Sequence, residues 1–249
     1  MKMGLDLGSA NVKLVWQKSD QSLEYKNYDT FDFYRRFALP QEGSFKLDLA
    51  SLGQPENTTI VACGYGRQAA AMSGAVPISE IQAHVHGAVW QSGLSDFLLL
   101  DLGGQDSKII SVKGGKTVGF STNDRCAAGS GRYLSNMAAV LGIDLAELST
   151  YRHNPVSLSA TCAVFGESEL VGEIIKGQSL AALAAGVNYS VVRRILPLLK
   201  RHLPAPAVLF SGGVAENQAI RKMLEHELEQ EVTVLPQPKF NGAIGCFYW

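Results

Sequence analysis

Two short segments of the sequence place an acidic residue directly before a glycine-containing turn. Asp6 begins Asp6-Leu7-Gly8-Ser9, and Asp101 begins Asp101-Leu102-Gly103-Gly104. Glycine lets backbone N–H groups approach a phosphate closely. A carboxylate just before the turn can hold Mg²⁺ through water, because Mg²⁺ prefers oxygen ligands and keeps much of its hydration. These residue types in this order predict a site for a nucleoside triphosphate.

The two segments are partial copies of each other. When they are aligned on Asp6 and Asp101, Asp, Leu, Gly and Lys recur in register, and Lys13 corresponds to Lys108. Each copy has the pattern of an apolar strand, a tight turn and a second apolar strand. One copy alone would equally fit a structural β-hairpin. Two such turns facing each other would clamp one nucleotide, so the repeat favours phosphate binding.

A third glycine motif follows a predicted buried strand at residues 207–210. Gly212 and Gly213 separate this strand from a predicted helix that runs to about residue 229. A glycine pair at such a turn lets a flat base or a ribose lie against the backbone. After two phosphate-type hairpins it predicts the adenosine site, although alone it would indicate a structural turn. The sequence contains no P-loop pattern, and Gly129-Ser130-Gly131 lacks the third glycine of a dinucleotide fingerprint.

Composition limits the classes of partner. The 249 residues include 22 basic and 23 acidic residues, with a net charge of −1, so nucleic acid is not an expected partner. No apolar run reaches the ~20 residues of a membrane span, and the first motif begins too early for a signal peptide. We therefore expect a cytoplasmic protein with no membrane association. Under reducing conditions its four cysteines would not form structural disulfides.

Cys126 and Cys162 each precede the expected start of a helix. The partial positive charge of a helix N-terminus stabilises a thiolate and suits the sulfurs of an iron-sulfur cluster. Neither cysteine belongs to a Cys-x-x-Cys pair, so one chain lacks the four thiolates that a 4Fe-4S cluster normally takes. Two chains related by a twofold axis would supply four. From spacing alone, two buried free cysteines remain the alternative; Cys63 and Cys246 are expected to be ordinary buried thiols.

The elements that position these motifs follow from periodicity and turn residues. Residues 79–88 have a helical pattern with Ser79 as a possible N-cap. His84 and His86 are two positions apart there, so their rings point to different faces and a metal pair is not expected. Residues 92–95 are the best candidate for a domain junction, and residues 19–57 carry no recognisable motif. We also expect a hairpin at residues 3–16 and a helix at residues 180–201 that kinks or ends near Pro197. A strand is expected at residues 232–235, and a last helix after the turn of small residues at 241–245.

The order of the three nucleotide motifs resembles the actin-like ATPase superfamily, which also contains Hsp70 and the sugar kinases. The segments beginning at Asp6 and Asp101 match its two phosphate motifs, and Ser211-Gly212-Gly213 matches its adenosine motif. The resemblance implies an α/β fold of two related actin-like (ribonuclease H-like) ATPase domains with a nucleotide cleft between them. We expect domain I over residues 1–95, joined by a C-terminal helix at about 241–249, and domain II over residues 96–240.

Two further segments resemble a narrower family, the 2-hydroxyacyl-CoA dehydratase activators, which includes the ATPase subunits of benzoyl-CoA reductase. Residues 123–132 and 162–169 are similar to its two cluster-ligand motifs, and residues 101–108 and 212–217 fit the same family. The resemblance implies a homodimeric ATPase with one 4Fe-4S cluster shared between the two subunits. A ferredoxin or flavodoxin would reduce the cluster. The electron would then pass at low potential to a separate iron-sulfur dehydratase or reductase.

The same resemblance assigns roles to individual residues. Asp6 and Asp101 would be catalytic, positioning Mg²⁺ and water, and Gln105 would orient the attacking water because it directly follows the second glycine turn. Cys126 and Cys162 would be the cluster ligands. The residues implied to bind ATP are Gly8, Ser9, Lys13, Gly103, Gly104, Gly212, Gly213 and Asn217.

Two other functions fit parts of the sequence. A small-molecule kinase of the same fold, similar to a type III pantothenate kinase and lacking a cluster, would explain the nucleotide motifs but not the cysteine motifs. Such a kinase needs an acceptor site with a general base, which no segment indicates. A non-catalytic scaffold subunit would be expected to have lost the metal-holding carboxylates, yet Asp6 and Asp101 are both present.

Overall fold

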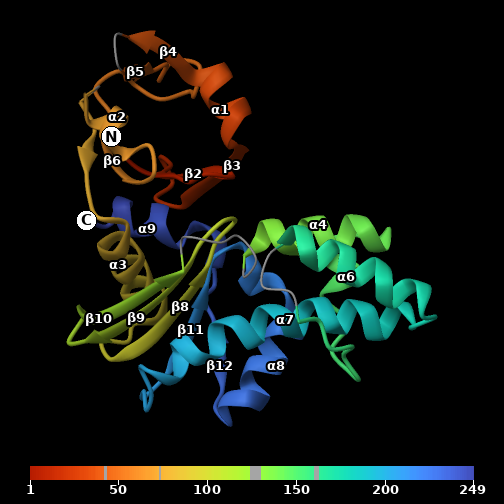
Figure 1. The fold of residues 1–249 in the computed structure, drawn as a ribbon. Coiled ribbons are helices and arrows are strands. Elements are labelled where there is room, and N and C mark those ends of the chain that lie inside the picture. Colours follow the sequence, from red (N-terminus) through yellow and green to blue (C-terminus); the bar gives the residue numbers. More distant parts are fainter. Residues whose placement is uncertain (42–43, 73, 124–129, 160–162) are drawn as a thin grey trace. The chain divides into compact units, whose positions relative to one another are not determined.

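The computed structural model describes residues 1–41, 44–72, 74–123, 130–159 and 163–249 (Figure 1). Contacts divide the chain into two compact units. The first unit contains Met1–Ser95, Gly114–Thr117 and Lys239–Trp249, and the second contains Asp96–Lys113 and Val118–Pro238. The C-terminal segment therefore belongs to the same unit as the N-terminus.

The first unit is built on a sheet with strand order β3-β2-β1-β6-β7. Its central strand β1 (Lys2–Leu7) pairs antiparallel with β2 (Asn11–Gln17) and parallel with β6 (Thr59–Gly64). Outer strands are β3 (Leu23–Asp29), antiparallel to β2, and β7 (Val76–Pro77), parallel to β6. Alternate side chains of β1 point to opposite faces of the sheet, so each face needs its own cover.

One face of this sheet packs against the segment that follows β3. Helix α1 (Thr30–Phe37) begins after Asp29, whose carboxylate accepts hydrogen bonds from the backbone N–H groups of residues 31 and 32. Phe33 and Phe37 are buried beside β1 and β2. Two short strands, β4 (Ala38–Gln41) and β5 (Ser44–Leu47), and helix α2 (Arg67–Met72) complete this layer. Residues 19–57, which carry no recognisable motif, thus help to cover one face of the first sheet.

Helices α3 (Glu80–Ser92) and α9 (Asn241–Phe247) cover the other face. The backbones of β1, α3 and α9 approach so closely that only glycine fits where they touch. A Cβ atom on Gly4 would collide with the carbonyl oxygen of Ala243, and one on Gly87 or Gly245 would collide with the backbone of the opposite helix. This absence of side chains fixes α9 firmly between β1 and α3.

The second unit repeats the sheet of the first. Its strand order is β10-β9-β8-β11-β12. β8 (Phe97–Leu102) pairs antiparallel with β9 (Ser107–Lys113) and parallel with β11 (Val208–Ser211). Strand β12 (Val232–Val234) runs parallel to β11, and β10 (Lys116–Asn123) lies next to β9. The sequence repeat therefore reflects a repeated topology, and every residue of β8 is buried, as expected for a strand covered on both faces.

Helices α4 (Gly131–Leu141), α5 (Leu145–Leu148), α6 (Ala163–Ile175), α7 (Leu180–Lys200) and α8 (Gln218–Leu228) belong to the second unit. Helix α7 buries Val187, Val191 and Ile195 on its apolar side and packs against α8. It passes through Pro197 and ends at Lys200, close to the position predicted from that proline. Among the helices that the structure describes, none is long and apolar enough to span a bilayer.

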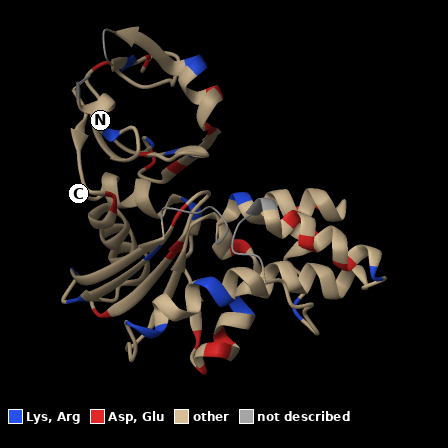
Figure 2. Ribbon diagram, viewed as in Figure 1, with Lys and Arg blue, Asp and Glu red and all other residues tan. Residues whose placement is uncertain are grey.

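Acidic and basic residues are intermixed on the helices and strands of both units (Figure 2). This distribution agrees with the net charge of −1.

Candidate ATPase site

The first glycine turn joins β1 to β2 and keeps Asp6 opposite Lys13. The two residues pair across the strands, and Lys13 Nζ lies 3.3 Å from Asp6 Oδ2. Asp6 is only 4% exposed, so the lysine supplies charge compensation for a nearly buried carboxylate. Gly8 lies at the turn, where its carbonyl oxygen accepts a 2.9 Å hydrogen bond from Thr30 Oγ1. Ser9 follows at the exposed end of the turn.

The second turn joins β8 to β9 in the same way. Asp101 is paired with Lys108, whose Nζ lies 3.9 Å from Asp101 Oδ2 and also bonds the carboxylate of Asp106. Gly103 donates its N–H to the carbonyl oxygen of Asp106 at 3.0 Å, which closes the turn. Gln105 lies half-buried within it. Both Asp101 and Lys108 are nearly fully buried, so this hairpin is the more enclosed of the two.

Helix α4 begins directly on the second turn. The backbone N–H of Gly131 donates to the carbonyl oxygen of Gly103, and that of Arg132 donates to the carbonyl oxygen of Gly104, both at 2.9 Å. Ser130 Oγ also donates to the Gly104 carbonyl oxygen at 2.9 Å. The first residues of α4 are therefore attached to the backbone of the predicted phosphate turn.

The predicted adenosine turn is attached to Asp101. Ser211 is paired with Asp101 across the parallel strands, and its Oγ donates a 2.7 Å hydrogen bond to Asp101 Oδ1. Gly212 has φ of +86°, and a Cβ there would collide with the carbonyl oxygen of Leu102. A Cβ on Gly213, by contrast, would meet no protein atom within 4 Å. The turn thus needs glycine at 212 for its own backbone, and leaves open space at 213.

The first unit contains a counterpart of this turn that the sequence analysis did not identify. Gly64 is the last residue of β6 and has φ of +87°, and a Cβ there would lie 2.6 Å from the carbonyl oxygen of Leu7. Cys63 is paired with Asp6, as Ser211 is with Asp101. The available signal was a glycine directly after a short β-branched strand at the matching place in the repeat.

Asn217, which was predicted to bind ATP, is the N-cap of α8. Its Oδ1 accepts a 3.0 Å hydrogen bond from the N–H of Ile220, and its Nδ2 donates a 2.9 Å bond to Asn188 Oδ1. The side chain is buried and fixes the start of the helix after the adenosine turn. Its role toward ATP stays a prediction.

The four cysteines fall into two groups. Cys126 and Cys162 lie outside the described residues. Cys63 and Cys246 are buried free thiols, as expected, and share one apolar cluster in the first unit. The hydrogen bond between these two thiols, the burial, and the negative charges of Asp6 and Glu80 together raise the pKa of Cys63 well above its usual range. Cys246 Sγ donates to the carbonyl oxygen of Leu5 at 3.6 Å.

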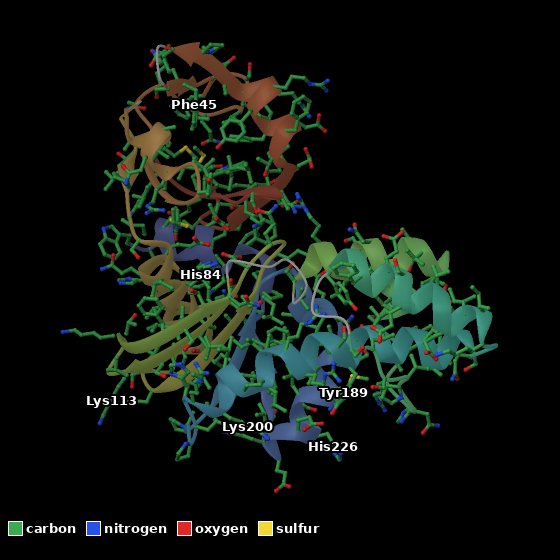
Figure 3. All side chains as sticks on the ribbon, viewed as in Figure 1. Phe45, His84, Lys113, Tyr189, Lys200 and His226 are labelled. Carbon is green, nitrogen blue, oxygen red and sulfur yellow. The ribbon has the colours of Figure 1, made fainter. Side chains whose placement is uncertain are left out.

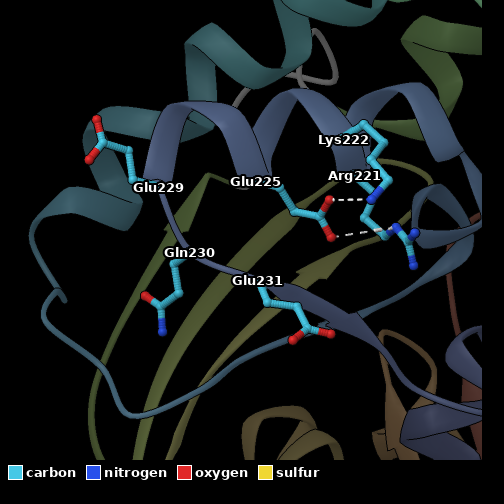
Figure 4. A pocket seen from close by; sticks show the side chains of 6 residues that line it. All are labelled: Arg221, Lys222, Glu225, Glu229, Gln230 and Glu231. Carbon is cyan, nitrogen blue, oxygen red and sulfur yellow. Dashed lines mark hydrogen bonds and ion pairs between the residues drawn. The ribbon is translucent and has the colours of Figure 1, made fainter.

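A shallow hollow of about 420 Å³ lies at the end of α8 and the start of β12 (Figure 4). Its lining residues are charged except for Gln230, and Glu225 is paired there with Lys222 at 2.7 Å and with Arg221 at 3.8 Å. Although burial opposes it, the hydrogen bond from Lys222 lowers the pKa of Glu225. None of the three glycine turns lines this hollow.

The chain matches a family model described as the BadF/BadG/BcrA/BcrD ATPase family over residues 3–249. The chain belongs to this family. It is 33% identical to the (R)-2-hydroxyglutaryl-CoA dehydratase activating ATPase of Acidaminococcus fermentans, over 98% of this chain and 94% of the relative. It is 28% identical to one of the subunits of benzoyl-CoA reductase from Thauera aromatica, over 99% of this chain and 91% of the relative.

A comparison with a solved structure agrees with this family membership. The activator of the 2-hydroxyisocaproyl-CoA dehydratase from Clostridium difficile, with bound ADPNP, superimposes with a TM-score of 0.82 at 29% identity, covering 99% of this chain and 92% of that one. These comparisons confirm the family recognised from the sequence motifs. They also confirm an α/β fold with two sheets of the actin and sugar-kinase type. As a member of the BadF/BadG/BcrA/BcrD family, the chain is an ATPase that binds ATP.

Proposed function

We propose that this BadF/BadG/BcrA/BcrD family member is an ATP-dependent activator of an iron-sulfur enzyme. It passes a low-potential electron from a 4Fe-4S cluster, shared across a homodimer, to a partner dehydratase or reductase of the 2-hydroxyacyl-CoA dehydratase type. Relatives named as dehydratase activators and as part of a benzoyl-CoA reductase support this function. In our proposal the electron donor is a ferredoxin or flavodoxin and the protein is cytoplasmic.

The glycine turn of each unit supports the binding of ATP phosphates. Each turn follows a buried aspartate that is paired with a lysine on the next strand, Asp6 with Lys13 and Asp101 with Lys108. Open space at Gly213 would admit the adenosine group. Gly8, Ser9 and Gly104 would contribute backbone N–H groups to the phosphates, and Gly103 would let the backbone approach them closely. Gln105 would orient the attacking water.

The acidic residues fit Mg²⁺ held mainly through water. Among the described residues there is no group of three His, Cys, Asp or Glu side chains that could enclose a metal ion. Mg²⁺ commonly uses one or two carboxylates, several waters and the phosphates of its nucleotide. Asp6 and Asp101, buried at the two turns, match that requirement. Their part is to fix water and cation beside the phosphates.

The thiols fit a cluster only when two chains combine. Cys63 and Cys246 are buried in the interior of the first unit, which leaves Cys126 and Cys162 as the two thiols of each chain that could bind iron. Two chains would give the four thiolates of a 4Fe-4S cluster. When bound, the cluster would supply the one-electron carrier. Helix α6, which begins directly after Cys162, has exposed apolar side chains that a dimer contact would cover: Phe165 is 70% and Ile175 is 81% exposed.

One observation carries the link between ATP and electron delivery. The start of α4, which follows the Cys126 segment, is hydrogen-bonded to both glycines of the second phosphate turn. A change in that turn on ATP binding or hydrolysis would therefore move the start of α4. Helix orientation and solvent exposure around a cluster are known to affect its potential.

The test is a measurement of iron and acid-labile sulfide on anaerobically purified protein, beside the Cys126→Ala and Cys162→Ala variants. The proposal expects about two irons per chain in a brown dimer, from one 4Fe-4S cluster per two chains. Either variant should lose the iron while still hydrolysing ATP. A colourless, iron-free wild-type protein with ATPase activity would refute the activator function and favour a small-molecule kinase of the same fold.

A further inference from the structure

His84 of α3 lies beside the Asp6 carboxylate, although the two residues are far apart in the sequence. Both side chains approach Gly242, in the first turn of α9. A Cβ placed on Gly242 would be 3.2 Å from Asp6 Oδ2 and 3.3 Å from His84 Nε2. The two polar atoms therefore border the same small space, close enough for one bridging water to join them. Figure 3 labels His84 on this helix.

The tautomer of His84 is set by Asn241. Asn241 Nδ2 donates a 2.9 Å hydrogen bond to the His84 carbonyl oxygen, and Asn241 Oδ1 accepts a 3.0 Å bond from Gln91 Nε2. These two bonds orient the amide so that its Nδ2, 3.3 Å from His84 Nδ1, is a donor to the ring. Nδ1 then accepts, and the ring hydrogen lies on Nε2, the atom beside Asp6.

A second carboxylate adjoins the same ring atom. Glu80 lies one helical turn before His84, and its Oε1 is 3.9 Å from Nε2, which is too long for a direct hydrogen bond. His84 is 6% exposed, whereas the Glu80 side chain is 30% exposed. The imidazole Nε2 thus has two carboxylates near it, the buried Asp6 across the space at Gly242 and the more exposed Glu80 at 3.9 Å, and both suit water-mediated contacts.

The backbone holds this arrangement rigidly. α3 and α9 are in contact through Gly87 and Gly245, where any side chain would collide with the opposite helix. Gly242 itself leaves the space that Asp6 and His84 border. Preorganisation of this kind is what a positioning residue needs, since small displacements weaken its effect.

We propose that His84 is a positioning residue of the ATPase centre: its Nε2–H holds a water molecule beside the Asp6 carboxylate, and Glu80 supports that water from the exposed side. The water belongs to the hydration through which Asp6 engages Mg²⁺, so the inference rests on the role proposed above for Asp6. His84 is not a metal ligand in this arrangement.

The helix itself offers a matched control. His86 is exposed, and the centroid of its ring lies 4.8 Å from that of Trp249. We would compare His84→Ala, His84→Gln and His86→Gln with the wild type. His84→Ala removes the N–H donor of the ring. His84→Gln keeps an N–H donor near the position of Nε2, so it tests whether that donor alone restores the function of His84.

Two measurements separate positioning from folding. The first is the affinity for Mn²⁺, used as a paramagnetic substitute for Mg²⁺, in the presence of a non-hydrolysable ATP analogue. The second is steady-state ATP hydrolysis with kcat and KM resolved, and thermal unfolding checks the fold. His84→Ala should weaken Mn²⁺ affinity and lower kcat by about 10- to 100-fold, as loss of outer-shell partners does, with KM for ATP changed far less. His84→Gln should recover most of both losses, and His86→Gln should match the wild type.

Wild-type Mn²⁺ affinity and kcat in His84→Ala would overturn the inference. So would a loss that His84→Gln does not reverse although that variant unfolds at the wild-type temperature. An Asp6→Asn variant distinguishes this failure from failure of the proposed site. If Asp6→Asn abolishes ATP hydrolysis while His84→Ala leaves it at the wild-type level, only the inference about His84 is refuted. If Asp6→Asn hydrolyses ATP normally, both the proposed role of Asp6 and the inference about His84 are refuted.

Discussion

The hydroxyl of Ser130 donates a 2.9 Å hydrogen bond to the carbonyl oxygen of Gly104, and so attaches the start of α4 to the second phosphate turn. Ser130 is the N-cap residue of α4 by position, but its side chain makes no capping bond to the helix. The hydroxyl is therefore available to the turn rather than to the helix. In the proposed function, this contact would link the nucleotide turn to the start of α4.

Ser130→Ala should weaken the response of the cluster to ATP while leaving hydrolysis within about threefold of wild type, because one neutral hydrogen bond is lost. The measurement is the rate at which a chelator removes cluster iron, with and without ATP. Ser135→Ala is the control, since Ser135 lies on the same helix, is exposed and donates to the carbonyl oxygen of Gly131 within that helix. An unchanged ATP response in Ser130→Ala would contradict the proposed route.

Removal of the Ser211 hydroxyl should affect both stability and catalysis. The Asp101 carboxylate would lose a buried 2.7 Å bond, and we expect a loss of about 1.5–3 kcal/mol in the free energy of unfolding. Ser211→Cys places at this site the residue that the first unit has opposite Asp6, and its weaker S–H donor should give an intermediate loss. Denaturant unfolding and ATPase assays should rank the wild type first, Ser211→Cys second and Ser211→Ala last in both stability and activity. Equal free energies of unfolding in all three proteins would show that this hydrogen bond does not contribute to stability.

The two glycines of the adenosine turn should respond differently to alanine. Gly212→Ala forces a side chain into a positive φ and against the Leu102 carbonyl oxygen, so a destabilisation of about 3 kcal/mol or more is expected. Gly213→Ala meets no protein atom and should leave the unfolding temperature unchanged. If adenosine lies against Gly213, that variant should nevertheless raise KM for ATP. An unchanged KM would remove Gly213 from the site.

The two lysines opposite the aspartates should also differ. The Lys13 side chain is 21% exposed and that of Lys108 is 6% exposed. Lys13→Met should raise KM for ATP about tenfold, which corresponds to about 1.4 kcal/mol. It should also destabilise the fold, because Asp6 loses its compensating cation, but by less than Lys108→Met, because water reaches the Lys13 side chain. Lys108→Met removes the cation beside a buried carboxylate and should cost about 3–5 kcal/mol of stability. Urea unfolding and ATP titration distinguish the two outcomes; equal destabilisation by both substitutions would contradict the difference in burial.

The raised pKa of Cys63 predicts a pH dependence of stability. In the unfolded chain the thiol ionises near pH 8.5, whereas in the folded protein it keeps its proton to higher pH. The folded state therefore binds more protons above about pH 8.5, and the free energy of unfolding should fall as pH rises, by up to about 1.4 kcal/mol per pH unit. Cys63→Ala should remove this part of the slope. The comparison is best made in a background with Cys126 and Cys162 replaced by alanine; parallel slopes would show that Cys63 ionises normally.

Local sequence patterns contained much of the candidate nucleotide site. Each Asp and its Lys belong to one hairpin, so a short turn of fixed length sets their pairing, and the register in the structure brings Asp6 to Lys13 and Asp101 to Lys108. The long helix α7 and the start of α8 followed from periodicity and turn residues in the same way. Helix α1 was not predicted, because its short mixture of aromatic and charged residues has no clear period without its partners.

The sequence by itself thus determined the hairpins, the glycine turns and the family. Only the tertiary structure decided which distant residues meet the two aspartates: Ser211 beside Asp101, Cys63 opposite Asp6, and His84 beside Asp6 at Gly242. These contacts depend on the register of parallel strands joined by long connections and on α9 packing between β1 and α3. No local pattern encodes such a register, because it is fixed by the packing of segments that are remote along the chain.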